Sequence, residues 1–244
     1  RRDIENHKIA EIRRVLGEVK SKTDLLTGAV LDDPVIHART KGVGVLTRQD
    51  VIDYGAVGPT ARASGVAIDV RKDDPYAAYP LVDWKVITSE AGDVFAKAEV
   101  RLLEMYESIS IIEQCLKGLE KEKEGDINVK VTEIPEGIGN GRAEAPRGEV
   151  FHFVVSDGSN SPARHKIRAP SYVNIATFKK SCIGQTIADA TITLAGVDPC
   201  YCCTERLAVV CDARSGEKLM NARELIERSA ARTASLNKEF NCNK

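Results

Sequence analysis

The chain has 244 residues, 43% of them hydrophobic, which is enough to bury one sizeable core or two small ones. Its 35 basic and 36 acidic residues leave a net charge of -1, which excludes the global basic field that binds nucleic acid, so no nucleic-acid partner is expected. No stretch approaches the roughly 18 apolar residues that cross a bilayer, so any membrane role should come through partner subunits.

The start of the chain predicts two helices. Apolar residues recur at near-helical spacing over residues 4–27, which predicts an amphipathic helix that ends near Gly28. The segment TRQDVIDYG predicts a short capped helix that begins near Thr47 and stops at Gly55.

Residues 56–92 follow, with no sustained period and with three X-Pro pairs that interrupt them. So long an irregular segment is uncommon in a compact domain and is often functional. Over residues 93–124, apolar residues at spacings of three and four then predict the longest helix, a core helix with a solvated end.

From residue 127 the period changes to two. INVKVTEI, RGEVFHFVVSDG and ARHKIRAP predict strands of a small antiparallel sheet, interrupted by a Gly-rich turn at PEGIGNGRAEAP, residues 135–146. An apolar helix is expected over residues 184–196, and a charged amphipathic helix after residue 220. These elements predict an α+β fold, mainly helical, with a core helix bundle and a small antiparallel sheet.

Three thiols lie within four positions in DPCYCC, residues 198–203. The odd total of seven cysteines favours metal or thiol chemistry in a reducing environment over disulfides. Zinc is disfavoured because no second pair of ligands completes a four-ligand site, and a thioredoxin-like dithiol should lie early in a βαβ unit. Idle thiols remain possible for isolated cysteines. An incomplete set of soft thiolates points to nickel, iron or a cluster with further ligands elsewhere.

Four segments resemble the large subunit of energy-converting nickel-iron hydrogenases and the related quinone-site subunit of respiratory complex I. They are YGAVGPTARASGVAIDVRKDDPYAAY, GDVFAKAEVRLLEMYESISIIEQCL, EAPRGEVFHFVVSDGSNSPARHKIRAPSYVN and DPCYCCTER. The last resembles the hydrogenase C-terminal signature. Complex I relatives of this kind have lost the metal-binding thiols, so Cys200 and Cys203 favour the hydrogenase.

The resemblance implies that Cys200 is a terminal nickel ligand and that Cys203 bridges nickel and iron, with carbon monoxide and cyanide on the iron. Arg147 matches the arginine that overhangs the nickel, where it would act with Asp198 to polarise dihydrogen or to handle its proton. The alternative for Arg147 is a salt bridge that closes the Gly-rich turn. Pro146 would line the same canopy, the protein surface above the metals.

The resemblance also implies roles for three supporting residues. Ser171 would donate a hydrogen bond to a cyanide ligand. His152 fits a position behind the metal ligands, although a core histidine with satisfied hydrogen bonds fits as well. Cys202 occupies a position that the family does not use as a ligand, and we expect a packed thiol there.

Two departures from the family lead to further expectations. The family's other C-x-x-C pair is N-terminal and has no counterpart in residues 1–199, and the chain starts at Arg1 in place of Met. We therefore expect an N-terminal part to be missing from the hydrogenase large-subunit-like domain, residues 1–206, and this chain alone to be inactive. Arg206 holds the position after which a maturation endopeptidase would cut, so residues 207–244 would be a removable extension; a permanent helix is the alternative.

The resulting hypothesis is the catalytic large subunit of a membrane-associated energy-converting nickel-iron hydrogenase. Its expected partners are a small iron-sulfur subunit that carries the electron-transfer clusters, integral membrane subunits and the endopeptidase, with a cytoplasmic place on the inner face of the membrane. Two other classes stay open: a non-hydrogenase electron-transfer or quinone-type module of a complex I-like assembly, and a zinc-binding interaction protein.

Overall fold

The computed structural model describes residues 4–122, 125–126, 128, 130–204, 209–212 and 214–239. The chain divides into two compact units, Arg1–Cys203 and Thr204–Lys244. The first contains α1 (Asn6–Leu31), α2 (Pro34–Thr40), α3 (Arg48–Tyr54), α4 (Pro59–Arg62), α5 (Val70–Asp73), the 3-10 helix η1 (Tyr79–Leu81), α6 (Val94–Leu119), strands β1 (Glu136–Ala145), β2 (Gly148–Asp157) and β3 (Arg164–Arg168), then α7 (Pro170–Asn174), the 3-10 helix η2 (Ile175–Thr177), α8 (Phe178–Cys182) and α9 (Ile187–Val197).

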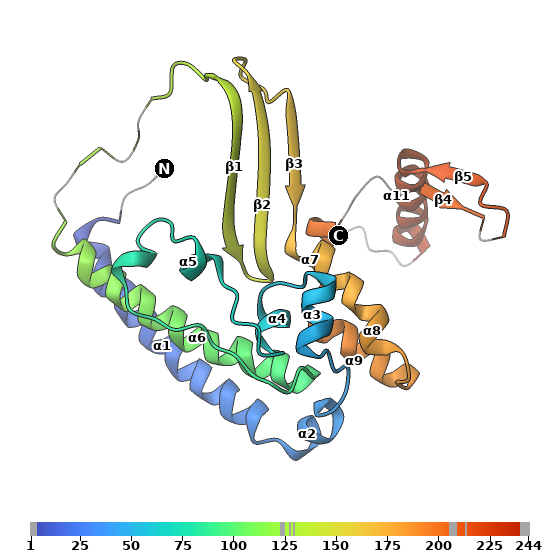
Figure 1. Cartoon of the computed structure of the whole chain (residues 1–244), viewed down its shortest axis with the longest axis horizontal. Coiled ribbons are helices and arrows are strands. Elements are labelled where there is room, and N and C mark those ends of the chain that lie inside the picture. The colour runs from blue at the N-terminus through green and yellow to red at the C-terminus, as the bar shows by residue number, and fades with distance from the viewer. Residues whose placement is uncertain are drawn as a thin grey trace. The chain divides into compact units, whose positions relative to one another are not determined.

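The two long helices α1 and α6 lie side by side and form the base of the first unit (Figure 1). Asp93 precedes the first residue of α6, and its side chain accepts from the backbone N–H of Ala96 and so caps the helix. Helix α1 continues past Gly28 to Leu31, so the helix was predicted correctly but its end was not. The irregular segment 56–92 contains three short helices, α4, α5 and η1. Of these, α4 packs against α6.

The helix α3 forms where TRQDVIDYG predicts it. Thr47 and Asp50 make a reciprocal capping box, in which each side chain bonds the other residue's backbone N–H. Gly55 ends the helix in the left-handed conformation, with φ 63. Both signals are local, and both expectations are confirmed.

The sheet has the order β1-β2-β3 and is antiparallel throughout (Figure 1). Ala145 pairs with Gly148, so Pro146 and Arg147 form a two-residue turn between β1 and β2. The Gly-rich segment expected as a turn is therefore strand β1, and the described residues between 125 and 135 form no strand, so both predictions were wrong. Pairing with β2 along all ten residues overrides the low strand propensity of glycine.

The helix α9 confirms the expected helix before DPCYCC, and the short α10 (Tyr201–Thr204) follows it. The second unit contains β4 (Val209–Cys211), β5 (Lys218–Asn221) and α11 (Ala222–Glu239). Its charged helix was predicted, whereas its hairpin was not. The expected cleavage position, Arg206, lies outside the described residues, so removal of the extension stays a prediction. None of the helices described is long and apolar enough to cross a bilayer.

Candidate metal site

Arg147 lies in the turn between β1 and β2 and reaches the end of α9. Its Nε donates to the backbone carbonyl of Asp198 and its Nη2 to Asp198 Oδ1, each at 3.0 Å. Asp198 itself ends α9 in the left-handed conformation, with φ 57. The salt bridge of Arg147 therefore joins two distant segments and does not close its own turn, so the structure brings the two predicted catalytic residues together.

The backbone of this turn is held by a buried asparagine on α7. Asn174 accepts from the N–H of Val57 at 2.9 Å and donates to the carbonyls of Val57 at 3.1 Å and Arg147 at 3.0 Å. Gly58 lies against the same carbonyl: a Cβ added at this position would stand only 2.4 Å from the Arg147 oxygen, so a larger residue would not fit. Neither Asn174 nor Gly58 was predicted from the sequence, although the Gly-Pro pair in the irregular segment was a visible signal.

The cysteines begin two residues after Asp198. The N–H of Cys200 donates to Ser171 Oγ at 3.1 Å, and the N–H of Cys203 donates to the carbonyl of Cys200 at 3.0 Å. The Cys203 thiol also forms a hydrogen bond with the Cys200 sulfur, which lowers the pKa of Cys200 and raises the pKa of Cys203. The two sulfurs of the C-x-x-C are therefore neighbours, and Cys200 is the one that loses its proton more readily.

The remaining predicted residues are placed as follows. Ser171 is buried, and its hydroxyl keeps a hydrogen to donate after its oxygen has accepted from Cys200. His152 lies in β2 and contacts His165 of β3, Nδ1 to Nε2 at 2.9 Å, so its described contacts do not include the cysteines or Arg147. Cys202, in the short α10, is exposed, so the expected packed thiol is wrong.

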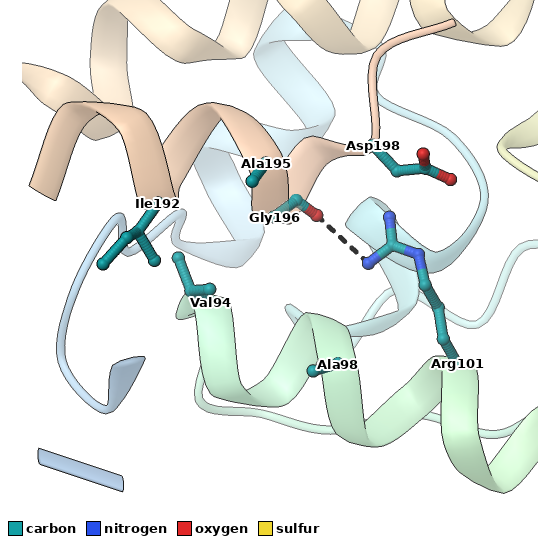
Figure 2. A pocket seen from close by; sticks show the side chains of 7 residues that line it. All are labelled: Val94, Ala98, Arg101, Ile192, Ala195, Gly196 and Asp198. Carbon is teal, nitrogen blue, oxygen red and sulfur yellow. Dashed lines mark hydrogen bonds between the residues drawn. The ribbon is translucent and has the colours of Figure 1, made fainter. Parts of the chain in front are cut away.

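Two cavities meet at Asp198 and Arg101. One, of about 400 Å³, lies between α6 and α9, as Figure 2 shows. The other, of about 510 Å³, runs between α1 and α6 and is also lined by Pro146. The predicted canopy residues Pro146 and Asp198 therefore line one space, directly beside the turn that carries Arg147.

Arg101 is a member of this site that was not predicted from the sequence. Its Nη1 donates to the carbonyl of Lys97 at 2.8 Å. The same nitrogen donates to the carbonyl of Gly196 at 3.0 Å (Figure 2). Its Nε and Nη2 are buried and, within the described part of the chain, have no hydrogen-bond partner. Burial lowers the pKa of Arg101. A charged residue on the apolar face of the helix expected at 93–124 was the available signal.

The donor set fits part of a nickel-iron centre. Among the residues described, no group of three or more His, Cys, Asp and Glu side chains could hold a metal ion. Cys200 and Cys203 supply two adjacent sulfurs, which are soft donors suited to nickel or iron and poorly suited to a hard cation. Cys200 and Cys203 would thus be two ligands of such a centre, which would need further ligands from elsewhere.

Comparison with known proteins places these features in a family. Residues 1–133 and 125–206 match the family described as respiratory-chain NADH dehydrogenase, 49 Kd subunit. The chain is 37% identical over 201 residues to an NADH-quinone oxidoreductase subunit of Herpetosiphon aurantiacus, covering 81% of this chain and 54% of that protein. It is 41% identical over 175 residues to the carbon monoxide-induced hydrogenase of Rhodospirillum rubrum, covering 71% and 48%.

A solved structure agrees with these relatives. A chain of the membrane-bound sulfane sulfur reductase, an archaeal respiratory membrane complex, has a TM-score of 0.79 and 30% identity, over 84% of this chain and 57% of that chain. The chain thus spans about half the length of the curated relatives it matches. The resemblance stated from the sequence motifs is confirmed, and the chain belongs to the family of the 49-kDa subunit of respiratory-chain NADH dehydrogenase.

Proposed function

We propose that this chain belongs to the catalytic large subunit of a membrane-associated energy-converting nickel-iron hydrogenase. Such an enzyme would be an oxidoreductase that interconverts dihydrogen with protons and electrons. One observation carries the proposal: the hydrogen-bonded thiols of Cys200 and Cys203 come within five residues after Asp198, the residue that Arg147 binds. A quinone-type module of the same fold would have no need of this thiol pair.

The residues of the site would divide the work. Cys200 and Cys203 would hold one side of a nickel-iron centre with carbon monoxide and cyanide on its iron, and that centre supplies the cleavage or formation of dihydrogen. Ser171 would donate its hydroxyl hydrogen to a cyanide nitrogen. Arg147, held by two hydrogen bonds, presents a fixed positive charge beside the site. Asp198 offers a carboxylate that can hold a proton beside that guanidinium.

The partners follow from the same proposal. The site supplies two thiolates, so the other ligands would come from a part of the large subunit that this chain does not contain. Electrons would pass through iron-sulfur clusters of a small partner subunit. Integral membrane subunits would hold the complex on the inner face of the membrane, and a maturation endopeptidase would cut after Arg206.

A second candidate is a non-hydrogenase electron-transfer or quinone-type module of a complex I-like assembly. The 37% identity with an NADH-quinone oxidoreductase subunit favours it. The cavity of about 510 Å³, lined by apolar side chains such as Leu16 and Ile109, gives it space for an apolar ligand. In this case Cys200 and Cys203 would carry no nickel.

Metal analysis of the intact, matured complex separates the candidates. We expect nickel and hydrogen-dependent dye reduction in the wild type, loss of both in Cys200→Ser and Cys203→Ser, and retention of both in Cys202→Ser, the matched control from the same turn. A wild-type complex with neither nickel nor hydrogen-dependent activity would refute the hydrogenase and leave the quinone-type module. Stoichiometric zinc that is lost in Cys200→Ser would instead indicate a zinc-binding interaction protein.

A further inference from the structure

Two histidines lie next to each other on one face of the sheet, in the neighbouring strands β2 and β3 (Figure 1). His152 pairs with Ile167, and His165 pairs with Val154. The histidines are therefore diagonal neighbours across the ladder, a spacing that long side chains can bridge. His152 Nδ1 lies 2.9 Å from His165 Nε2, with the ring centroids 5.1 Å apart. The ladder thus brings two imidazole nitrogens together at the surface of the sheet.

The space beside the two histidines is open on the side of β1. Gly141 pairs with His152, and Gly139 lies two positions away in the same strand, so both glycines share the face of the histidines. A Cβ added at either glycine would meet nothing within 4 Å. His165 is exposed and His152 is half-buried. Water and dissolved ions can therefore reach the two nitrogens.

Within β1, β2 and β3, no charged side chain shares this face with the histidines. Alternation along the strands places Arg142, Arg164 and Lys166 on the opposite face. The larger neighbours on the histidine face are apolar, namely Val150, Val154 and Ile167. A face without carboxylates offers no ligand to a hard cation such as magnesium, whereas imidazole suits nickel, copper and zinc.

The separation of the two nitrogens fits two adjacent positions around one metal ion. Metal–nitrogen bonds of about 2.0–2.1 Å that stand about 90° apart place their nitrogens about 2.8–3.0 Å from each other, whereas tetrahedral bonds place them about 3.3–3.4 Å apart. The observed 2.9 Å matches the first arrangement. Nickel(II) and copper(II) adopt such right-angled geometries with nitrogen and oxygen ligands, whereas zinc prefers the tetrahedral one.

Binding of an ion needs one lone pair from each ring. At present one ring donates its N–H to the other. The donor ring would take the tautomer that carries its hydrogen on the outer nitrogen, which is Nε2 in His152 and Nδ1 in His165, and both rings would turn toward the ion. From two neutral imidazoles this step releases no proton and transfers no electron. Water would fill the remaining coordination positions on the open side.

We propose that His152 and His165 bind one nickel(II) or copper(II) ion, which fastens β3 to β2. This inference goes beyond the proposed function and does not depend on it. β3 is the edge strand of the sheet, and it pairs with β2 over only five residues. An ion held by one histidine from each strand adds a cross-link at this short edge.

The cross-link would act on the helix that follows β3. Only Ala169 separates β3 from α7, the helix that carries Ser171 and Asn174. These two residues bond the N–H of Cys200 and the carbonyl of Arg147. An ion that fixes β3 therefore also steadies the start of the helix that supports the candidate site.

Calorimetric titration of the full chain with nickel(II) tests the binding. Every protein would carry Cys200→Ser, Cys202→Ser and Cys203→Ser, so that the cysteine turn does not compete for the ion. We expect this background protein to bind one ion, and His152→Asn and His165→Asn each to weaken binding at least about tenfold. His7→Asn is the control, because His7 is an exposed histidine on α1, and it should leave the affinity unchanged. No binding by the background protein, or equal binding by both sheet variants, would overturn the inference.

Hydrogen exchange of the same proteins tests the cross-link. Nickel(II) should slow exchange of the β3 and α7 amides in the background protein and in His7→Asn, but not in His152→Asn or His165→Asn. Exchange in β3 that nickel leaves unchanged, despite binding, would refute the fastening of β3 to β2. Neither measurement uses hydrogen turnover, so a failure of the proposed function would leave both results valid.

Discussion

Arg147 binds Asp198 twice, through Nε to the backbone carbonyl and through Nη2 to the carboxylate, at 3.0 Å in each case. Two donors of one planar guanidinium thus fix both the main chain and the side chain of a residue 51 positions away. Because Cys200 lies two residues after Asp198, the same contact sets where the cysteine turn begins. The contact between Arg147 and Asp198 therefore links the β1–β2 turn to the end of α9, just before the segment that carries the thiols.

Arg147→Lys should separate metal binding from turnover. An ammonium cannot reproduce the two-point contact of the guanidinium, so the orientation of Asp198 should be lost while the sulfurs of Cys200 and Cys203 remain. In the intact complex we expect an unchanged nickel content and hydrogen oxidation slower by about tenfold or more. Arg142→Lys is the control, since Arg142 lies on β1 with an exposed partner, Asp74. Full activity of Arg147→Lys would refute the canopy role.

Gly58→Ala should disturb the site through the Arg147 carbonyl. Gly58 has φ 68, and its new Cβ would stand 2.4 Å from the Arg147 oxygen. Gly55→Ala is a close control, because Gly55 has φ 63 but an added Cβ there meets nothing within 4 Å. Urea unfolding should show a loss of about 1 kcal/mol for Gly55→Ala, from the backbone conformation alone.

The contact with Arg147 should make Gly58→Ala costlier than this control, by about 1–3 kcal/mol, the usual cost of overpacking. Only Gly58→Ala should also reduce activity of the complex. Equal losses of stability for the two glycine variants would mean that the turn moves freely, and that Gly58 does not position Arg147.

Asn174→Ala should destabilise the first unit. The change leaves the N–H of Val57 and the carbonyls of Val57 and Arg147 without their described partner in a buried place. An unsatisfied buried group costs about 1–3 kcal/mol, so the free energy of unfolding should fall by about 2–4 kcal/mol in urea. Asn160→Ala, in the exposed loop after β2, should change it by less than about 0.5 kcal/mol. Similar small losses in both variants would contradict the anchoring role of Asn174.

The parts of the fold that the sequence predicted are those with local causes. The capping box at Thr47 and the C-cap at Gly55 lie within a single short helix, and the apolar spacing of α6 is a property of one segment. Strand β1 was missed because its glycine-rich sequence has low strand propensity of its own. The strand forms because it pairs with β2 along its whole length, and such pairing cannot be read from the composition of one segment. Local patterns therefore predicted the helices better than the sheet.

The same division holds for the site. Cys200 and Cys203 are close in sequence, and their pairing follows from the C-x-x-C spacing. Asn174 acts on Val57 across 117 residues, so its role has no local signature. Residues that supply chemistry were recognisable by type, whereas the residues that position them emerge only from long-range contacts.

Lys97 should make stability depend on pH. Its side chain is buried on α6, where Nζ donates to the carbonyl of Gly44 at 2.8 Å, and burial lowers its pKa to about 8. The unfolded chain, with a lysine pKa of about 10.4, binds more protons above pH 8, so the free energy of unfolding should rise by up to about 3 kcal/mol between these values. Urea unfolding across this range should show that rise in the wild type and in Lys117→Met, an exposed control on the same helix. Lys97→Met should abolish this rise in the free energy of unfolding, because the buried side chain then carries no titrating charge. A rise that persists in Lys97→Met would assign the titration to another group.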